Sequence, residues 1–197
     1  MSNSPKILAF AGSTRTDSYN KKLARIAAES AKLAGAEVTW MDLRDYPLPI
    51  YDGDQEDKNG LPANAIKVRA LLQSHQGFLI SCPEYNSSIS GVLKNMVDWA
   101  SRPKDGEEPL ACFQDKVIGL LSASPGQLGG IRGLVAVRSL FGNIGSLILP
   151  QQVCIAKADE AFGEDGSLKN AGEKKRVDGL ANAIVRLLTK LAREQIH

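Results

Sequence analysis

The sequence predicts an α/β fold in which a doubly wound parallel sheet carries helices on both faces, giving three layers. Short apolar runs alternate with amphipathic stretches about five times, which is typical of repeated β-α units. The apolar runs lack strict alternation, as expected for strands that are buried on both faces. The 197 residues are too few for an eightfold β/α barrel, which typically needs about 250. Because no linker or repeat divides the chain, residues 1–197 are expected to form a single domain.

The expected strands are short apolar runs bounded by glycine, proline or polar residues. They cover residues 6–11, 37–43, 77–82 and 116–124, with a fifth strand in the region 145–156. The first run starts after Pro5 and stops at Gly12, so its limits are marked by residues that end regular structure.

The expected helices carry apolar residues at spacings of three and four, with charged residues between them. They cover residues 20–34, 63–74, 91–101, 130–141 and 170–195. The fourth helix is expected to be interrupted near Gly133. The stretch 44–62 is rich in Pro, Gly and Asp, so it is expected to be a long loop without regular structure.

The composition excludes several classes of function. The net charge is +2, from 24 basic and 22 acidic residues, and no basic stripe occurs, so nucleic acid is not an expected partner. No apolar run approaches the roughly 20 residues of a membrane helix, so no membrane partner is expected either. The N-terminus lacks the basic and apolar regions of a signal peptide.

The cysteines and histidines argue against disulfides and metals. Cys82, Cys112 and Cys154 are scattered and odd in number, which is typical of a reducing compartment. The chain has two histidines and neither an HExxH nor a paired CxxC motif, so no protein-held metal site is expected. We therefore expect a cytoplasmic protein without a structural metal.

Three loops carry most of the chemistry. In a doubly wound sheet, ligands bind beyond the carboxyl ends of the strands, where the strand order reverses. The loops 12–20, 83–91 and 122–130 follow the first, third and fourth expected strands, and they are the richest in hydroxyls, amides and glycines. These loops are therefore the expected ligand site.

The first loop precedes a helix and suits a phosphate. A helix N-terminus offers free amides and a partial positive charge. The loop adds side-chain donors from Ser13, Thr14, Arg15, Thr16, Ser18 and Asn20. It matches neither the ATP-type P-loop nor the dinucleotide fingerprint, so a phosphomonoester is favoured. The alternative is simple helix capping, which needs only one or two such residues. The Asp17 side chain is expected to point outward, away from an anion.

The second loop offers a ring face at Tyr85 and an amide edge at Asn86, which together could bind a planar heterocycle. The alternative is a tyrosine that packs on its own loop. Glu84 with Tyr85 could also act as an acid/base pair, although no histidine or metal site is expected nearby.

The third loop contains Gly126, Gly129 and Gly130. These glycines either let the backbone approach a ligand or simply allow a turn, and the sequence favours neither reading. Ser122 and Ser124 could suggest a hydrolase nucleophile, but the GxSxG motif is absent, so a Ser-His-Asp triad is not expected.

At these loops the sequence resembles the NAD(P)H-dependent FMN reductase family, which includes flavin, quinone, azo-dye and chromate reductases. The matching stretches are "GSTRTDSYN", "PEYNSSISGVLKNMVDWAS" and "SASPGQLGG". The resemblance implies a flavodoxin-like fold with a five-stranded sheet of order 2-1-3-4-5. Where relatives commonly carry Leu and Pro, this chain has Thr14 and Ser90.

The resemblance also implies which residues bind FMN. Those expected to hold the phosphate are Ser13, Arg15, Ser18 and Asn20. Those expected to line the isoalloxazine ring are Pro83, Glu84, Tyr85 and Asn86. Ser124 and Gly126 are expected on the other side of the flavin, and Thr14 and Tyr19 complete the expected cofactor-binding set.

The implied activity is a ping-pong transfer of two electrons from NAD(P)H through FMN to a small-molecule acceptor, without a side-chain acid or base. A homodimer or homotetramer is expected, on the resemblance and on apolar positions in 91–101 and 131–141. The alternatives are a flavodoxin-type electron carrier and a non-catalytic flavin-binding protein. Such carriers present an acidic face, which the net charge of +2 does not favour.

Overall fold

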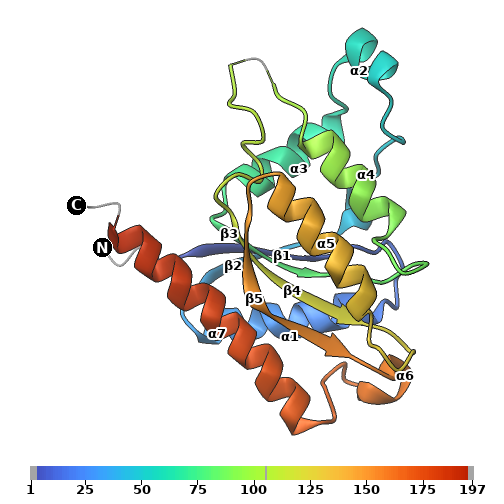
Figure 1. Cartoon of the computed structure of the whole chain (residues 1–197), viewed down its shortest axis with the longest axis vertical. Helices are drawn as coiled ribbons and strands as arrows, with labels where there is room; N and C mark the ends of the chain where they lie inside the picture. The colour runs from blue at the N-terminus through green and yellow to red at the C-terminus, as the bar shows by residue number, and fades with distance from the viewer. Residues whose placement is uncertain (1–3, 105, 195–197) are drawn as a thin grey trace.

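The fold is a five-stranded parallel sheet between two layers of helices, as the computed structural model shows for residues 4–104 and 106–194 (Figure 1). The strands are β1 Lys6–Ala11, β2 Glu37–Met41, β3 Gly77–Ser81, β4 Val117–Ala123 and β5 Leu147–Ile155. All neighbours pair in parallel in the order β2-β1-β3-β4-β5. The predicted fold class and strand order are confirmed.

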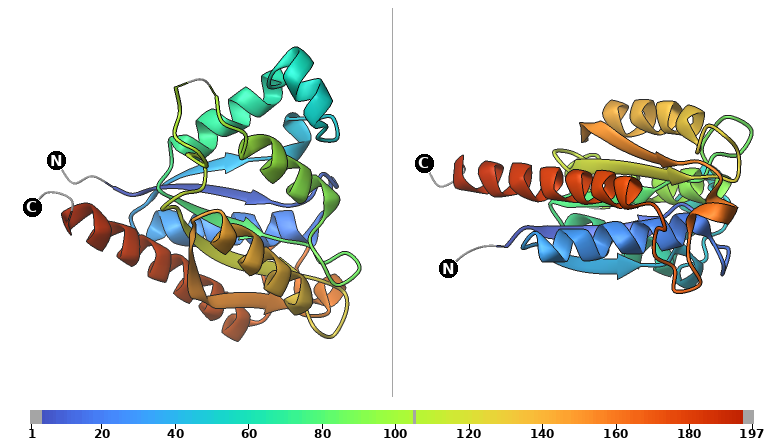
Figure 2. Two further views of the ribbon diagram at one scale, coloured as in Figure 1. Left: turned by 45° about the horizontal axis from the view of Figure 1, so that its top comes forward. Right: turned by 90° about the horizontal axis from the view of Figure 1, so that it is seen from below.

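The helices divide between the two faces of the sheet (Figure 2). One face is covered by α1 Tyr19–Leu33 and α7 Ala171–Glu194, and the other by α3 Ala63–Gln73, α4 Gly91–Ala100 and α5 Ile131–Asn143. Residue 195, where the last helix was expected to end, lies outside the described residues. Among those residues, no helix is both long and apolar enough to cross a membrane.

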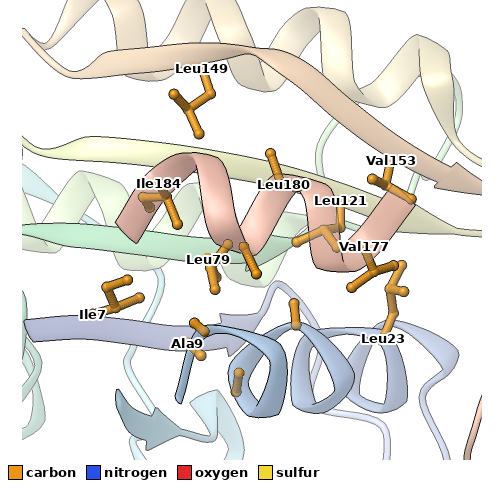
Figure 3. Close-up of a cluster of buried hydrophobic side chains, with 14 of the residues drawn as sticks. Ile7, Ala9, Leu23, Leu79, Leu121, Leu149, Val153, Val177, Leu180 and Ile184 are labelled. Atoms are coloured by element: carbon orange, nitrogen blue, oxygen red, sulfur yellow. The ribbon is translucent and has the colours of Figure 1, made fainter. Parts of the chain in front are cut away.

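Alternate residues of each strand supply two separate cores. In β1, Ile7 and Ala9 pack with α1 and α7, whereas Leu8 and Phe10 pack with α3, α4 and α5. Figure 3 shows the first of these clusters, in which side chains of the strands, such as Leu79 and Leu121, gather with those of α1 and α7. Both faces are buried, which explains why the strands read as apolar runs rather than as alternating patterns.

The stretch 44–62 contains regular structure that the prediction missed. A short 3-10 helix, η1 Leu43–Asp45, directly follows the second strand, and α2 Gly53–Asn59 follows further on. Both begin at aspartates, because the carboxylates of Asp42 and Asp52 accept the backbone N–H groups of the residues two positions later. No residue of α2 is buried, so its amphipathic signal is absent from the sequence.

Two further expectations need correction. α5 runs without interruption through Gly133, because that glycine is needed for close packing against Glu84 rather than to break the helix. A short helix, α6 Ala158–Ala161, follows β5 and was not predicted. The fifth strand region forms one continuous strand, β5, and its register against β4 shifts between Ile118 and Leu120. Pro150 is tolerated within it because β5 lies at the edge of the sheet.

The strand order brings the three chemistry-bearing loops together. β3 lies between β1 and β4, so the loops that follow these strands are neighbours at the carboxyl edge. In Figure 2 the strand arrows point toward the end of the molecule where these loops gather. The fold thus positions the candidate site at the reversal of strand order, as expected for a doubly wound sheet.

Candidate functional site

Most of the predicted binding residues line one small cavity at the carboxyl edge of the sheet. The cavity measures about 90 Å³. Its lining consists of Ser13, Arg15, Ser18, Tyr19, Asn20, Pro83, Glu84, Tyr85, Ala123, Ser124 and Pro125. The structure therefore brings all three loops to one place and adds Ala123 and Pro125, which the sequence did not single out.

The loop 12–18, here called the phosphate loop, leads into α1 and keeps two hydroxyl donors available. The Oγ of Ser13 accepts the N–H of Arg15 at 3.3 Å, and the Oγ of Ser18 accepts the N–H of Lys21 at 3.4 Å as the N-cap of α1. Neither hydroxyl donates to an acceptor among the described residues, although both serines are buried. Each O–H can therefore be donated to a ligand that only accepts hydrogen bonds.

Asn20, in the first turn of α1, joins this helix to the neighbouring strands instead of pointing freely into the cavity. Its Nδ2 donates to the carbonyl of Ala123 at 2.8 Å. Its Oδ1 accepts the N–H of Ala123 at 3.0 Å and the hydroxyl of Ser81 at 2.8 Å. The side-chain carbonyl is thus occupied and one amide hydrogen remains, so Asn20 chiefly fixes the relative positions of β3, β4 and α1.

The second loop forms a small hairpin, residues 85–88, here called the platform hairpin. Tyr85 and Ser88 exchange two backbone hydrogen bonds of 3.0 Å each. The two central residues, Asn86 and Ser87, have φ of +51° and +63°, as in the primed turns that favour tight hairpins. Tyr85 is 49% exposed beside the cavity, so its ring is presented to solvent rather than packed in the core.

Glu84 fastens the base of this hairpin to the start of α5. Its carboxylate accepts the N–H of Gly133 at 2.9 Å and pairs with the guanidinium of Arg132 at 2.9 and 3.0 Å. Burial alone would raise the pKa of Glu84, but the hydrogen bonds from Gly133 and Arg132 hold that pKa below its ordinary value. A carboxylate that is ionised at neutral pH and bonded to both Gly133 and Arg132 suits positioning, so Glu84 and Tyr85 are not the acid/base pair considered above.

The third loop uses two of its glycines for packing. A side chain at Gly130, where φ is +86°, would place its Cβ 1.9 Å from the Oγ of Ser122. One at Gly129, where φ is +59°, would meet the backbone of Ile155 and Ala156 at 2.9 Å. Gly126 is not among the glycines with positive φ, and a Cβ there would make only an ordinary contact with Ser124, so packing does not explain this glycine.

Two buried serines tie the loops to one another. Ser90 donates to the carbonyl of Gly12 at 2.6 Å and also caps α4, which begins at Gly91 as expected. Ser90 therefore links the second loop to the first. Ser122 donates to the carbonyl of Cys82 at 2.7 Å, so it is a structural hydroxyl rather than a nucleophile.

Several candidate residues lie elsewhere. Thr14 lines a second cavity on the other side of the phosphate loop, and the side chain of Asp17 is exposed. His75 lies at the amino end of the sheet, where its ring contacts Thr39 and the carbonyl of Leu71. Burial raises the pKa of the Cys82 thiol and raises that of Cys112 to about 11, so both remain protonated at neutral pH.

Two elements of the site carry no sequence signal. The pairing of Glu84 with Arg132 joins residues 48 positions apart, and the Ser81 to Asn20 bond joins residues 61 apart. Nothing in local composition predicts such contacts, because each depends on which strands become neighbours in the sheet.

Comparisons with known proteins agree with this architecture. The NADPH-dependent FMN reductase family model matches residues 5–160. A probable NADPH:quinone oxidoreductase of Oryza sativa subsp. japonica is 35% identical over 175 residues, covering 85% of this chain and 82% of the relative. The flavoenzyme NAD(P)H:(acceptor) oxidoreductase FerB of Paracoccus denitrificans has a TM-score of 0.76 at 25% identity, covering 94% of this chain and 98% of its own.

An archaeal flavodoxin has the same fold, with a TM-score of 0.62 at 10% identity, covering 93% of this chain and 98% of its own. The family match extends over well more than half of the chain and includes all three loops of the site. The chain therefore belongs to the NADPH-dependent FMN reductase family and is a flavodoxin-like oxidoreductase that works with FMN and a nicotinamide nucleotide.

Proposed function

We propose that this protein uses NAD(P)H to reduce quinones and related flat, electron-poor acceptors in two-electron steps, by a ping-pong mechanism. The proposal depends on one observation: Ser13 and Ser18, whose hydroxyls have no acceptor within the described chain, line the same small cavity as the exposed Tyr85. The similarity to the Oryza sativa relative, a probable NADPH:quinone oxidoreductase, supports the choice of acceptor class.

The phosphate loop fits the FMN phosphate by its donor set. A phosphate monoester accepts hydrogen bonds and carries negative charge, and the loop offers the O–H groups of Ser13 and Ser18 together with the N-terminus of α1. Arg15 lines the same cavity and is exposed, so its guanidinium can pair with the phosphate. Tyr19 adds an aromatic wall, and Asn20 keeps the loop in place.

The platform hairpin fits the flavin ring. Pro83, Tyr85 and Asn86 would lie against the ring, with Ser124 and Gly126 on its other side. When bound, FMN supplies the redox chemistry by accepting and passing on a hydride. The cavity of about 90 Å³ is far smaller than the roughly 300–1,000 Å³ of an enclosing ligand site, so much of the ring would remain accessible to a second molecule.

The acceptor specificity is expected to be broad. Strong selection between similar ligands requires buried hydrogen-bonding groups that the wrong ligand leaves unpaired. Beside Tyr85, the cavity lining described here includes no histidine, and the one buried carboxylate, Glu84, is fully engaged by Arg132 and Gly133. Quinone and azo acceptors are therefore both expected to be reduced.

Steady-state kinetics test this proposal. The FMN-loaded protein should oxidise NAD(P)H with an added quinone well above a free-FMN control, and double-reciprocal plots should give parallel lines. Intersecting lines would exclude the ping-pong order. A rate no higher than the free-FMN control would leave the flavodoxin-type carrier or the non-catalytic flavin-binding protein as the remaining functions.

Two variants connect the activity to the proposed residues. Arg15→Ala should weaken FMN binding by roughly tenfold or more, because a charge-assisted hydrogen bond is worth about 1.5–3 kcal/mol. Riboflavin, which lacks the phosphate, should bind more weakly than FMN, and equal affinities would contradict the assignment of the loop. Tyr85→Ala should slow acceptor reduction while leaving the unfolding free energy nearly unchanged, because the ring is half exposed.

A homodimer or homotetramer belongs to the same proposal. Except for the partly exposed Val92, the apolar residues of α4 are buried in the chain's own core, so they are not available for a partner. Leu128, Ile131 and Val135, in contrast, are 54%, 42% and 66% exposed at the start of α5. Light scattering should give a multiple of the chain's 21.2 kDa, and a monomeric mass would contradict the oligomer.

The cytoplasm is the proposed compartment. Cys82, Cys112 and Cys154 are all unpaired in the structure. Unpaired thiols fit a reducing environment, in which disulfides do not persist. Fractionation of cells that express the full chain, with detection by antibody, should recover it in the cytoplasmic fraction, and recovery from an extracellular fraction would contradict the placement.

A further inference from the structure

A second cavity of about 350 Å³ lies on the other side of the phosphate loop. Its volume is within the range of small-molecule sites, unlike the smaller cavity beside Tyr85. The lining comes from the phosphate loop, from residues 43–48 and from the first turns of α4, and consists of Thr14, Leu43, Arg44, Tyr46, Pro47, Leu48, Val92, Asn95 and Met96. Adjacent residues of one loop, Ser13 and Thr14, thus line two different cavities.

The walls of this cavity are apolar and firmly held. Leu43 and Met96 are buried core residues. The segment after η1 is tied to α4 at Pro49, whose carbonyl accepts the Nδ2 of Asn95 and the Nε1 of Trp99, both at 2.8 Å. The Oδ1 of Asn95 also accepts the backbone N–H of Tyr51 at 2.8 Å. The Asn95 amide therefore lines the cavity but is already hydrogen-bonded within the chain. The cavity therefore presents a preformed apolar surface suited to a flat ring.

A cation without an ion pair stands at the rim. The guanidinium of Arg44 is exposed and donates to the hydroxyl of Thr16 in the phosphate loop. Nearby Lys21 is already neutralised by Asp42 at 2.6 Å, whereas Arg44 has no carboxylate partner among the described residues. Asp45, which follows Arg44 in the chain, and Asp17, which follows Thr16, are both exposed. Arg15 in the phosphate loop and Arg44 beside it thus provide two guanidinium groups, although binding a single phosphate monoester needs only one.

We infer that this second cavity binds the adenine nucleotide end of the nicotinamide donor, with Arg44 pairing with the ribose phosphate that NADPH has and NADH lacks. The inference rests on the proposed function for the identity of the donor. This cavity shares no lining residue with the cavity beside Tyr85, so it is not the expected place for the reacting ring. It suits the remote, non-reacting end of a long dinucleotide, which requires an apolar surface for a purine and a cation for a phosphate. Arginine is the side chain best matched to phosphate geometry.

Calorimetric titration of the FMN-loaded protein tests the site without requiring turnover. The probes are AMP and the adenosine bisphosphate that carries the additional ribose phosphate of NADPH. The bisphosphate should bind more tightly than AMP, and Arg44→Ala should remove about tenfold of that preference. Arg186→Ala, an exposed arginine on α7, is the matched control and should change nothing. Equal binding of the two probes, or an unchanged preference in Arg44→Ala, would overturn the inference.

A cavity-filling variant supplies an independent check. Val92→Trp should weaken both probes, because the indole occupies the space of the purine, while FMN affinity and the far-ultraviolet circular dichroism remain as in the parent. Unchanged probe binding in this variant would also overturn the inference. Loss of FMN affinity in Arg44→Ala would instead assign Arg44 to the flavin phosphate and overturn the inference in that way.

Kinetics separate this inference from the proposed function. Arg44→Ala should raise KM for NADPH about tenfold and leave KM for NADH within twofold. A protein that oxidises neither nucleotide would contradict the proposed function, whereas equal changes in both KM values would contradict the role of Arg44 alone.

Discussion

The two ends of the sheet both bury polar groups, but they use them differently. At the amino end, the Nζ of Lys116 donates to the carbonyls of Gln73 and His75 at 3.1 and 2.6 Å. His75 contacts Thr39 and the carbonyl of Leu71 through its two ring nitrogens. At the carboxyl end, Ser13 and Ser18 accept backbone N–H groups but keep their own hydrogens free.

This difference distinguishes polar groups that only stabilise the fold from polar groups that can also bind a ligand. The polar groups of Lys116 and His75 at the amino end are bonded to neighbouring carbonyls and to the Thr39 hydroxyl, so their removal is expected to affect folding only. At the carboxyl end, Asn20 and Glu84 are likewise bonded to other parts of the chain and hold the loops in place, while a few neighbouring donors remain unused. The candidate binding site thus consists of hydroxyl groups that still have a hydrogen to donate, held in position by residues that are hydrogen-bonded within the chain.

The largest expected effect is the loss of a positioning residue. Asn20→Ala should lower the free energy of unfolding by about 3 kcal/mol, because it leaves the buried N–H and C=O of Ala123 and the Ser81 hydroxyl without their partner. FMN affinity should fall as well, since the loops lose their alignment. Urea unfolding and flavin fluorescence titration measure the two effects. A change in affinity without a change in stability would make Asn20 a direct ligand instead.

A matched pair of variants compares the two ends directly. Ser13→Ala should reduce FMN affinity about tenfold, through the loss of a hydrogen bond to a charged group, with a small effect on stability. Lys116→Met should do the reverse and lower stability by about 1 kcal/mol while FMN affinity stays constant. If Lys116→Met weakened FMN binding as much as Ser13→Ala, the distinction between the two ends would fail.

Acid pH should selectively weaken the clamp between the platform hairpin and α5. The pKa of Glu84 is lower in the folded chain than its ordinary value of 4.5, so its ionised form stabilises the fold above pH 4.5. This contribution is lost as the pH falls from 4.5 through the folded-state pKa. It amounts to about 1 kcal/mol at neutral pH, because Arg132 is 60% exposed and its charge is screened.

The measurement for this clamp is the difference in unfolding free energy between the parent and Glu84→Gln as a function of pH. The difference should be constant above pH 4.5 and shrink below it. A difference that does not depend on pH would show that the carboxylate charge has no part in the clamp.

The smallest expected effect concerns the turn of the platform hairpin. Ser87 has a φ of +63°, which costs a non-glycine residue roughly 1–2 kcal/mol. Ser87→Gly should therefore raise the free energy of unfolding by about 0.5 kcal/mol, after the entropy that glycine loses on folding. Thermal unfolding at equal FMN saturation measures the gain, and a destabilised variant would mean that the Ser87 hydroxyl has a further role.

The predictable part of the fold followed from patterns that are local in the chain. The positions of β1, β3 and β4 could be predicted from apolar runs, because these strands are buried on both faces of the sheet. The missed elements have no such signal: α2 buries no residue, and α6 has four residues. At Gly133, an apparent helix breaker is a contact surface for Glu84, which lies on a different loop.

The sequence by itself determined the α/β class, the succession of strands and helices, and the three loops in which donors are concentrated, because hydrophobic period and turn chemistry are written in neighbouring residues. Only the tertiary structure decided which donors are spare. Asn20 and Ser18 look alike as polar residues ahead of a helix, yet Asn20 is bonded to Ala123 and Ser81. Thr14 likewise turned from the predicted flavin site to a second cavity beside Arg44. Such assignments depend on distances between strands that are remote in the chain, and no local pattern contains them.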